Sequence, residues 1–448
     1  MNAITAYEYD VLVEDTANLP LSLKAKAVPT GMFSWLQAEA IRLSETSNTA
    51  WVRLSQTLGR PAVRLSNHVG VVRSADGFQL EILPKIAKVN SATNGDGEVR
   101  KLLIEMLRCL DGFRFIQSDK AMLAASEMPL LEVFIAEFLR SAEYLVKRGL
   151  RRDYITQQNN QFALRGKLLI SQHLRSNLVR KDRFYTEHDE YSLNRPANRL
   201  LRKAINRVLT WSLNNNNQKR ARELNFIFSE VPSPDSIRAD FQRLRLDRGM
   251  EHYQEAMSWV RLILGEQSPL TGQGTHSTIS LLFPMEAVFE AYVAKHLRRQ
   301  LKNEYQLTSQ VTSLSLVKHQ NKNWFRLKPD LLIRKGTINQ LVLDTKWKLI
   351  DTALNDGSSK YNLSQADFYQ LFAYGKHYLK GEGDVVLIYP KTENFKAALS
   401  VFEFTDNNCL KLWVVPFCLH EKRMILPACD SLNAFLSSEH RIANLQSG

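Results

Sequence analysis

Two aspartates and a lysine form the arrangement in this sequence that could do chemistry. Asp330 follows a proline, and 14 residues later Asp344 begins the run Asp344-Thr345-Lys346. Because side chains alternate along a strand, Asp344 and Lys346 would share one face. Two carboxylates on neighbouring strands suit Mg²⁺, which can polarise a phosphodiester and lower the pKa of a bound water. The lysine would then stabilise charge on the phosphate or help to orient that water.

The same residues also have a simpler interpretation. A Pro-Asp pair often forms a surface turn, and an Asp-x-Lys sequence on a strand often forms a solvated pair. The apolar run Leu341-Val342-Leu343 favours chemistry, because it should bury the carboxylate that follows, and an isolated buried charge is costly. We therefore take Asp330, Asp344 and Lys346 as candidate catalytic residues, with the two aspartates as metal ligands.

Helices on either side of this arrangement carry further polar residues. Glu286 and Glu290 lie one turn apart on a helix expected over about residues 284–301, so either could complete the acidic cluster. Glu286 also suits the first turn of a helix, where negative charge is favourable, so we choose Glu290 as the catalytic and metal-binding candidate. Gln370 and Tyr374 share one face of a later helix, where they could contact DNA or the acidic site, or form an ordinary half-buried face.

The order of these residues and elements resembles the PD-(D/E)xK nuclease superfamily, and the Gln-x-x-x-Tyr helix resembles its RecB-like branch. Further segments narrow the resemblance, and they include Leu164-Arg165-Gly166-Lys167-Leu168, Asn194-Arg195-Pro196-Ala197-Asn198-Arg199, Phe283-Pro284-Met285-Glu286 and Asp344-Thr345-Lys346-Trp347-Lys348. Over about residues 60 to 400 the chain thereby resembles the McrC family, the nuclease subunits of McrBC-type modification-dependent restriction systems.

This resemblance implies a Mg²⁺-dependent DNA endonuclease, in which Mn²⁺ would substitute. It implies a partner, a McrB-like AAA+ GTPase ring that recognises DNA with modified cytosine, and an N-terminal region that docks into the ring and stimulates its GTPase. The sequence agrees in one respect, since Gly272-Gln273-Gly274-Thr275 lacks the lysine of a phosphate loop. Two alternatives stay open: a stand-alone repair or recombination nuclease of the same superfamily, and a non-catalytic DNA-binding adaptor.

The charge of the chain also indicates a polyanionic partner. The 448 residues carry a formal net charge of +13. Residues 140–222 contain 19 Lys or Arg and 6 Asp or Glu, so the remainder of the chain is balanced. We predict that Arg175, Arg180, Lys181 and Arg183 in this stretch contact DNA, although basic residues also commonly lie on a solvated face.

Hydrophobic periodicity and turn signals predict a multidomain α/β (α+β) protein. We expect a β-rich domain at 1–95 that docks the partner, a mainly helical, basic, DNA-contacting domain at 96–275, and a PD-(D/E)xK restriction-endonuclease-like α/β domain at 276–448. No apolar run approaches the roughly 18 residues of a membrane helix, and the N-terminus lacks the features of a signal peptide. The four cysteines include no Cys-x-x-Cys pair, which fits a reduced cytoplasm.

Overall fold

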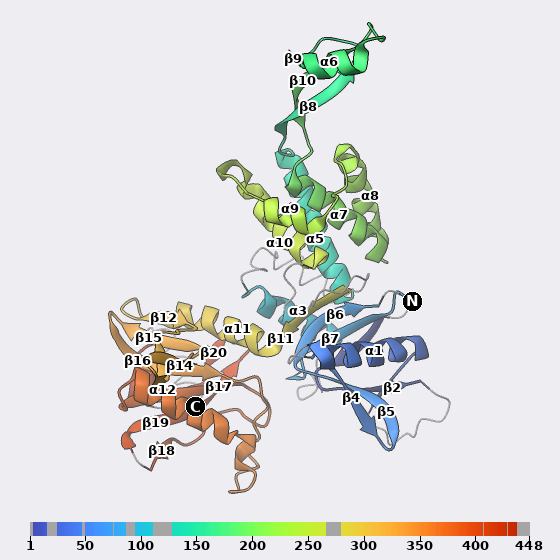
Figure 1. Ribbon diagram of the computed structural model, residues 1–448. Helices are drawn as coiled ribbons and strands as arrows, with labels where there is room; N and C mark the ends of the chain where they lie inside the picture. The colour runs from blue at the N-terminus through green and yellow to red at the C-terminus, as the bar shows by residue number, and fades with distance from the viewer. Residues whose placement is uncertain are drawn as a thin grey trace. The chain divides into compact units, whose positions relative to one another are not determined.

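A computed structural model describes residues 3–15, 25–46, 50–74, 76–86, 95–110, 128–265, 279–405, 407–427 and 429–436. The chain divides by packing into two compact units (Figure 1). The first contains Met1–Glu127 and Leu282–Gly448, and the second contains Met128–Leu281. The expected mixture of α and β structure is confirmed. The N-terminal and C-terminal regions pack as one unit, whereas the sequence led us to expect separate domains with boundaries near residues 95 and 275.

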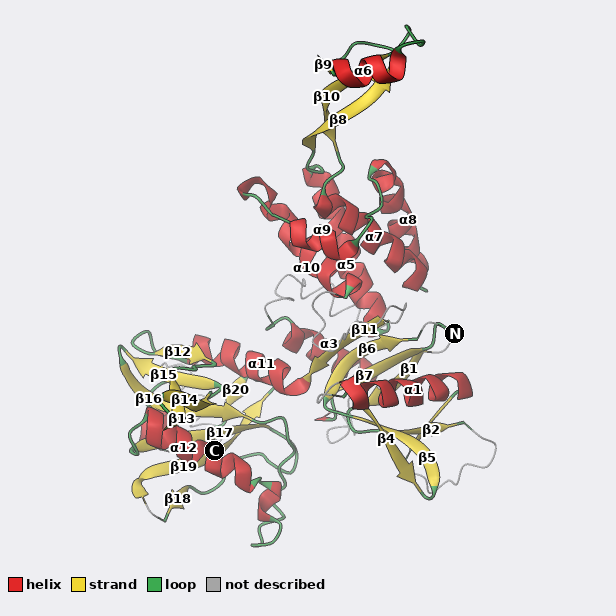
Figure 2. Cartoon of the chain, viewed as in Figure 1, coloured by secondary structure: helices red, strands yellow, loops and turns green. Residues whose placement is uncertain are grey.

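The N-terminal region of the first unit is β-rich, as its alternating sequence predicts (Figure 2). One sheet contains, in order, β3 (Lys26–Val28), β2 (Val11–Glu14), β5 (Arg60–Leu65) and β4 (Val52–Thr57). A second sheet contains, in order, β1 (Ala3–Tyr7), β7 (Gln79–Leu83), β6 (His68–Arg73) and β11 (Ile279–Pro284). Strand β11 is far from the other three strands in the sequence, so this sheet joins the N-terminal region to a distant segment of the chain.

Two helices accompany these sheets. Helix α1 (Thr30–Thr46) packs on the first sheet and buries Met32, Phe33 and Leu36. Helix α3 (Asp96–Leu107) packs against β7. Its Arg100 guanidinium donates to the buried Glu81 carboxylate of that strand, 2.8 Å between Nη2 and Oε2. This pair offsets the cost of burying a charge in the second sheet.

The C-terminal region of the first unit is built on a seven-stranded sheet. Its strands are, in order, β12 (Gln306–Ser309), β15 (Leu331–Lys335), β16 (Ile338–Thr345), β17 (Gly383–Pro390), β19 (Asn407–Cys418) and β18 (Phe402–Phe404), with β20 (Arg423–Met424) also on β19. Strands β15 and β16 are antiparallel, whereas β16, β17 and β19 run parallel. Strands β13 (Leu314–His319) and β14 (Lys322–Leu327) form a separate hairpin.

Helices α11 (Met285–Gln300) and α12 (Gln365–Tyr378) cover opposite faces of this sheet. On one face, α12 packs Leu371 into the cluster that contains Val342 of β16. On the other face, Phe289 of α11 packs against Trp347, with ring centroids 5.3 Å apart. Because side chains alternate along β16, Asp344 follows Val342 onto the α12 face. Short helices η4 (Lys360–Asn362) and α13 (Asp430–Asn433) complete the region.

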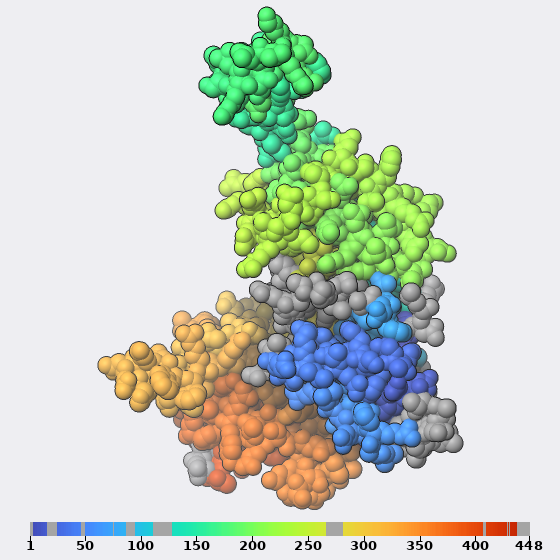
Figure 3. Space-filling view, turned by 45° about the vertical axis from the view of Figure 1, so that its right-hand side comes forward, coloured from blue at the N-terminus to red at the C-terminus, as the bar shows by residue number. Residues whose placement is uncertain are grey.

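The second unit is a helical bundle that carries a projecting β-hairpin (Figures 1 and 3). Its helices are α5 (Leu130–Arg148), α7 (Pro196–Trp211), α8 (Asn215–Ile227), η2 (Phe228–Glu230), α9 (Ile237–Arg243), η3 (Arg248–Tyr253) and α10 (Gln254–Leu264). The hairpin consists of β8 (Asp153–Gln161) and β10 (Phe184–Ser192), with β9 (Lys167–Leu168) and α6 (Ile170–Asn177) between them. We expected a mainly helical region here and did not predict the hairpin, because most of the β8 sequence is polar.

The N-terminal and C-terminal regions of the first unit meet at Trp347. The Trp347 indole Nε1 donates to Glu8 Oε2 at 2.9 Å, and the backbone N of Lys85 donates to the same oxygen at 3.0 Å. Lys85 Nζ in turn donates to the Trp347 carbonyl at 3.0 Å. Glu8 is 2% exposed, and this burial raises its pKa from the ordinary 4.5 to about 7. The N-terminal region therefore contacts Trp347, the residue that directly follows Lys346.

Replacing Glu8 with Gln should remove a pH dependence from stability. In the folded protein the raised pKa makes Glu8 hold a proton that the unfolded chain releases, so wild-type stability falls as pH rises from about 4.5 to about 7. Gln keeps the hydrogen-bond acceptor but does not titrate. We expect thermal unfolding to show the variant gaining a few degrees relative to wild type between pH 5 and pH 8. The exposed Glu403→Gln is the control, and an equal offset at both pH values would contradict this account.

Candidate active site

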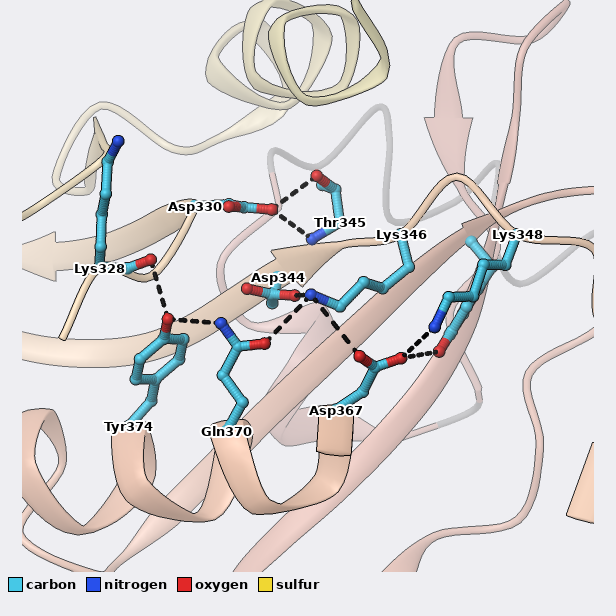
Figure 4. Close-up of polar contacts among 10 residues, drawn as sticks. Lys328, Asp330, Asp344, Thr345, Lys346, Lys348, Asp367, Gln370 and Tyr374 are labelled. Atoms are coloured by element: carbon cyan, nitrogen blue, oxygen red, sulfur yellow. Dashed lines mark hydrogen bonds and ion pairs between the residues drawn. The ribbon is translucent and has the colours of Figure 1, made fainter. Parts of the chain in front are cut away.

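Asp344 lies at the carboxyl end of a buried strand, and Lys346 neutralises it (Figure 4). The Asp344 side chain is 1% exposed, and its Oδ2 lies 2.5 Å from Lys346 Nζ. Burial and then the charge of Asp330 raise the pKa of Asp344 to about 7. Burial by itself lowers the pKa of Lys346, but the charge and hydrogen bond of Asp344 raise it overall. The lysine is therefore held as a cation beside the buried carboxylate.

Asp330 lies immediately before β15, beside the end of β16. Its Oδ2 accepts hydrogen bonds from the Thr345 backbone N at 2.8 Å and from Thr345 Oγ1 at 2.7 Å. The two predicted aspartates thus come from neighbouring strands, and the pKa effect of Asp330 on Asp344 reflects their closeness. This arrangement agrees with the strand alternation expected from the sequence.

Gln370 and Tyr374 connect α12 to this site. Gln370 Oε1 accepts a hydrogen bond from Lys346 Nζ at 3.2 Å, and Gln370 Nε2 donates to the Tyr374 hydroxyl at 2.7 Å. Tyr374 then donates to the Lys328 carbonyl at 2.9 Å, in the segment that leads to Asp330. Of the roles proposed for this pair, contact with the acidic site is present in the structure. Their contact with DNA stays a prediction.

Asp367 is a site residue that the sequence analysis missed. Its carboxylate lies 3.0 Å from Lys348 Nζ and 3.9 Å from Lys346 Nζ, and it accepts from the Tyr389 hydroxyl at 3.4 Å. It precedes Gln370 by three residues on the same face of α12. This spacing was a signal that could have found it.

Glu290 borders the aspartates from α11, as expected. Burial and then the charge of Asp330 raise its pKa to about 7. Gln310 Nε2 donates to its carboxylate at 3.1 Å, and the Gln310 backbone N donates to the Asp330 carbonyl at 2.8 Å. Gln310, which we did not predict, adopts a left-handed φ of 50° in making this link. Glu286 instead accepts from Asn67 Nδ2 at 2.5 Å, which agrees with the choice of Glu290.

The oxygen donors of this site suit a hard cation, although they do not form a ready-made cage. The described residues include no group of three or more Asp, Glu, His or Cys that could hold a metal. Asp344 and Glu290 nevertheless both have pKa values raised partly by the charge of Asp330, so negative charge accumulates here. A divalent cation would relieve that repulsion, and carboxylate oxygens are the ligands that Mg²⁺ prefers. In donor chemistry the three predicted ligands fit Mg²⁺.

The four basic residues predicted to contact DNA lie in the second unit, within what we call the tip segment, residues 162–183. Arg175 lies on α6, and Arg180 and Lys181 follow it in an exposed loop. The Arg183 guanidinium packs 4.5 Å from the centre of the Phe162 ring. The same segment exposes large apolar side chains, with Leu178 76% and Val179 90% exposed. Such an apolar surface is typical of a contact with another macromolecule.

The fold of the chain is similar to that of a solved structure. The chain matches the "Refined half-complex from tetradecameric assembly of Thermococcus gammatolerans McrB AAA+ hexamers with bound McrC" with a TM-score of 0.67 and 18% identity, covering 99% of both chains. It also matches the "Cryo-EM structure of the Thermococcus gammatolerans McrBC complex" with a TM-score of 0.48 and 22% identity, covering 66% of this chain and 88% of that one. No curated protein sequence matches.

A match to a protein family shows to which class of protein the chain belongs. The model of the family described as "McrBC 5-methylcytosine restriction system component" matches residues 63–390, which is more than half of the chain. The protein is thus a restriction-system component, and it belongs to this McrBC family. The resemblance to McrC that the sequence suggested is confirmed. Among the described residues, no helix is long and apolar enough to cross a membrane.

The pairing of Asp344 with Lys346 predicts a strongly non-additive mutant cycle. Lys346→Met should lower the free energy of unfolding by about 2–3 kcal/mol, because it leaves Asp344 buried without its cation. Adding Asp344→Asn should recover much of that loss, since no charge is then unpaired. Urea unfolding of the two single variants and the double variant measures the coupling. The exposed pair Lys335 with Glu304 is the control, where Lys335→Met should change little. Additive effects at Asp344 and Lys346 would contradict the pairing.

Proposed function

We propose that this chain is the DNA-cleaving subunit of its restriction system, a metal-dependent endodeoxyribonuclease of the PD-(D/E)xK type. The observation that carries the proposal is the pairing of Asp344 with Lys346 at the end of a buried strand, beside Asp330. A merely structural ion pair would not need two further acids, Asp330 and Glu290, and burial and then the charge of Asp330 raise the pKa of Glu290 to about 7. Membership of a restriction-system family supports this choice of substrate.

In this proposal Asp330, Asp344 and Glu290 hold Mg²⁺, for which Mn²⁺ can substitute. When bound, the ion supplies Lewis acidity toward the phosphate and lowers the pKa of a coordinated water. Lys346 stays protonated because Asp344 raises its pKa, so its ammonium can stabilise the charge that develops on the phosphate. Gln370 fixes the position of that ammonium, and Tyr374 fixes Gln370 against the Lys328 carbonyl.

We also propose that cleavage depends on a partner AAA+ GTPase ring that recognises modified cytosine in DNA and that this chain stimulates. The solved neighbour with a TM-score of 0.67 is described with McrB AAA+ hexamers, and its fold spans the whole of this chain. The N-terminal region, residues 1–95, is our candidate for docking. A cytoplasmic location, where the DNA is, forms part of the same proposal.

Loss of Asp344 should abolish cleavage without abolishing the partnership. We expect Asp344→Ala, mixed with the partner ring, GTP, Mg²⁺ and methylated plasmid, to cut at least about 100-fold more slowly than wild type, since it removes a proposed metal ligand. Stimulation of the GTPase by the same variant should persist. Asp356→Ala, an exposed acid of the same region, is the matched control. Wild-type cutting rates in Asp344→Ala would show that the site is misassigned, and cutting by the wild-type chain with Mg²⁺ alone would favour the stand-alone nuclease.

The tip segment has a second candidate function in place of DNA contact, which is a contact with the protein partner in addition to the docking proposed for residues 1–95. Its exposed Leu178 and Val179 favour this function, because phosphate contacts need cations and gain little from exposed aliphatic side chains. The neighbouring Arg180 and Lys181 keep DNA contact as the alternative.

Paired variants separate these two functions of the tip segment. We expect Leu178→Ser with Val179→Ser to lower affinity for the ring and stimulation of its GTPase roughly tenfold, with unchanged DNA binding, because the variant removes apolar contact area. Arg180→Gln with Lys181→Gln is the matched change of charge in the same loop. If that charge variant alone flattens the salt dependence of DNA binding while the apolar variant has no effect on the ring, the tip segment contacts DNA.

A further inference from the structure

A groove runs along α11 and begins at the candidate active site. It has a volume of about 830 Å³, and its walls come from α11, the end of α3 and the segment after β12. All of its described lining belongs to the first unit. Glu290 and Gln310, the pair that borders Asp330, lie among its lining residues. The groove therefore reaches the candidate active site at Glu290.

Small side chains line the groove on its α11 side. Ala287, Ala291 and Ala294 are four and three residues apart, so they share one face of the helix. None of them reaches beyond Cβ, and a ligand can therefore approach the helix closely. This hollow lies beside the wall that carries Glu290.

The groove is lined by positive charge. Arg108, Lys295, Arg298 and Arg299 contribute four cations, against Glu290 as the single acid among the described lining residues. Arg298 and Arg299 are exposed and form no ion pair with any residue that the structure describes. Arg108 Nε is buried and has no hydrogen-bond partner within the same described part of the chain. Lys295 Nζ donates to the Arg108 carbonyl at 3.5 Å, whereas the guanidinium groups of Arg298 and Arg299 lack an ion-pair partner among the described residues.

Helix electrostatics explain only some of these cations. Arg298 and Arg299 lie in the last turn of α11, where the helix dipole favours positive charge. Arg108 caps the C-terminal end of α3, where the same effect applies, whereas Lys295 lies a turn before the end of α11. Helix dipoles do not explain why cations from the ends of two helices line the same groove. A polyanion in the groove accounts for all four.

We propose that this groove, the α11 groove, binds the sugar-phosphate backbone of the DNA strand next to the phosphate that is cut. The inference rests on the proposed nuclease function and adds where the substrate strand runs. Arg guanidinium groups bind phosphate oxygens through two parallel hydrogen bonds, and such contacts fix the register of DNA without reading its sequence. The groove would thereby bring DNA of any sequence to the carboxylates, and recognition of a particular DNA sequence would take place elsewhere.

Binding of labelled duplex DNA by the full chain tests this proposal. The titration is followed by fluorescence anisotropy over a KCl series, with Ca²⁺ in place of Mg²⁺ to prevent cleavage. Each phosphate contact contributes about 0.9 to the slope of log K against log salt, so Arg298→Gln with Arg299→Gln should reduce the slope by about 2 and weaken binding roughly tenfold at low salt. Lys376→Gln removes a cation from the last turn of α12 and is the matched control, which should change neither value.

A pair of opposite charges at one exposed position tests the same groove without removing an arginine. Ala287→Glu should weaken DNA binding, and Ala287→Lys should strengthen it or leave it unchanged. Both side chains add similar bulk, so an effect of shape alone would have the same sign in the two variants. Equal weakening by both would overturn the electrostatic assignment.

The outcomes for the groove and for the nuclease are distinguishable. An unchanged salt slope in the double arginine variant, with normal cleavage by the wild-type complex, would overturn the groove and leave the nuclease in place. A reduced slope together with absent cleavage by the wild-type complex would overturn the nuclease function, and with it the claim that the bound strand is the one cut. A reduced slope, unchanged control and normal wild-type cleavage is the result that we expect.

Discussion

The site depends on one interaction, the ion pair between buried Asp344 and Lys346. A carboxylate at the end of an apolar strand loses most of its hydration, and a compensating cation two residues later on the same face restores a favourable charge balance. The rest of the site is arranged around that lysine. Helix α12 supplies Gln370 to hold it and Asp367 to share its charge, and Thr345, between the paired residues, holds Asp330. The end of β16 thus positions the carboxylates of Asp330, Asp344 and Asp367, which come from three different elements.

The N-terminal region takes part in this arrangement from a distance. Glu8 and Lys85 hold both the side chain and the carbonyl of Trp347, the residue that follows Lys346. Phe289 packs on the same indole from α11, one residue before Glu290. A contact at the N-terminal sheets is therefore connected by packed and hydrogen-bonded residues to both sides of the candidate site. These contacts form a continuous path from residues 1–95, the region proposed for docking, to Lys346.

Local periodicity in the sequence was sufficient to predict several contacts of the site. Contacts between residues far apart in the sequence could not be predicted in this way. Alternation placed Asp344 and Lys346 on one face, and helical spacing placed Gln370 with Tyr374, because both depend on neighbouring residues. Gln310 and Glu8 act through partners brought close only by the fold, so no local pattern marks them. The hairpin of β8 and β10 was not predicted because β8 is mostly polar. Its two strands pair along their whole length, although few of the β8 side chains are buried. The packing of residues 1–95 with the C-terminal region could not be predicted either, since β11 lies nearly 200 residues away in sequence.

The central claim is that Asp330 and Asp344 hold a divalent cation beside Lys346. Crystals of the full chain soaked in Mn²⁺ and measured at the manganese absorption edge test it most directly, because anomalous scattering locates the ion without assumptions about catalysis. The account predicts an anomalous peak between the Asp330 and Asp344 carboxylates, on the side toward Glu290, which disappears in Asp344→Ala. Crystals that show no peak there at saturating Mn²⁺, with Lys346 still paired to Asp344, would contradict the claim and favour a non-catalytic DNA-binding adaptor.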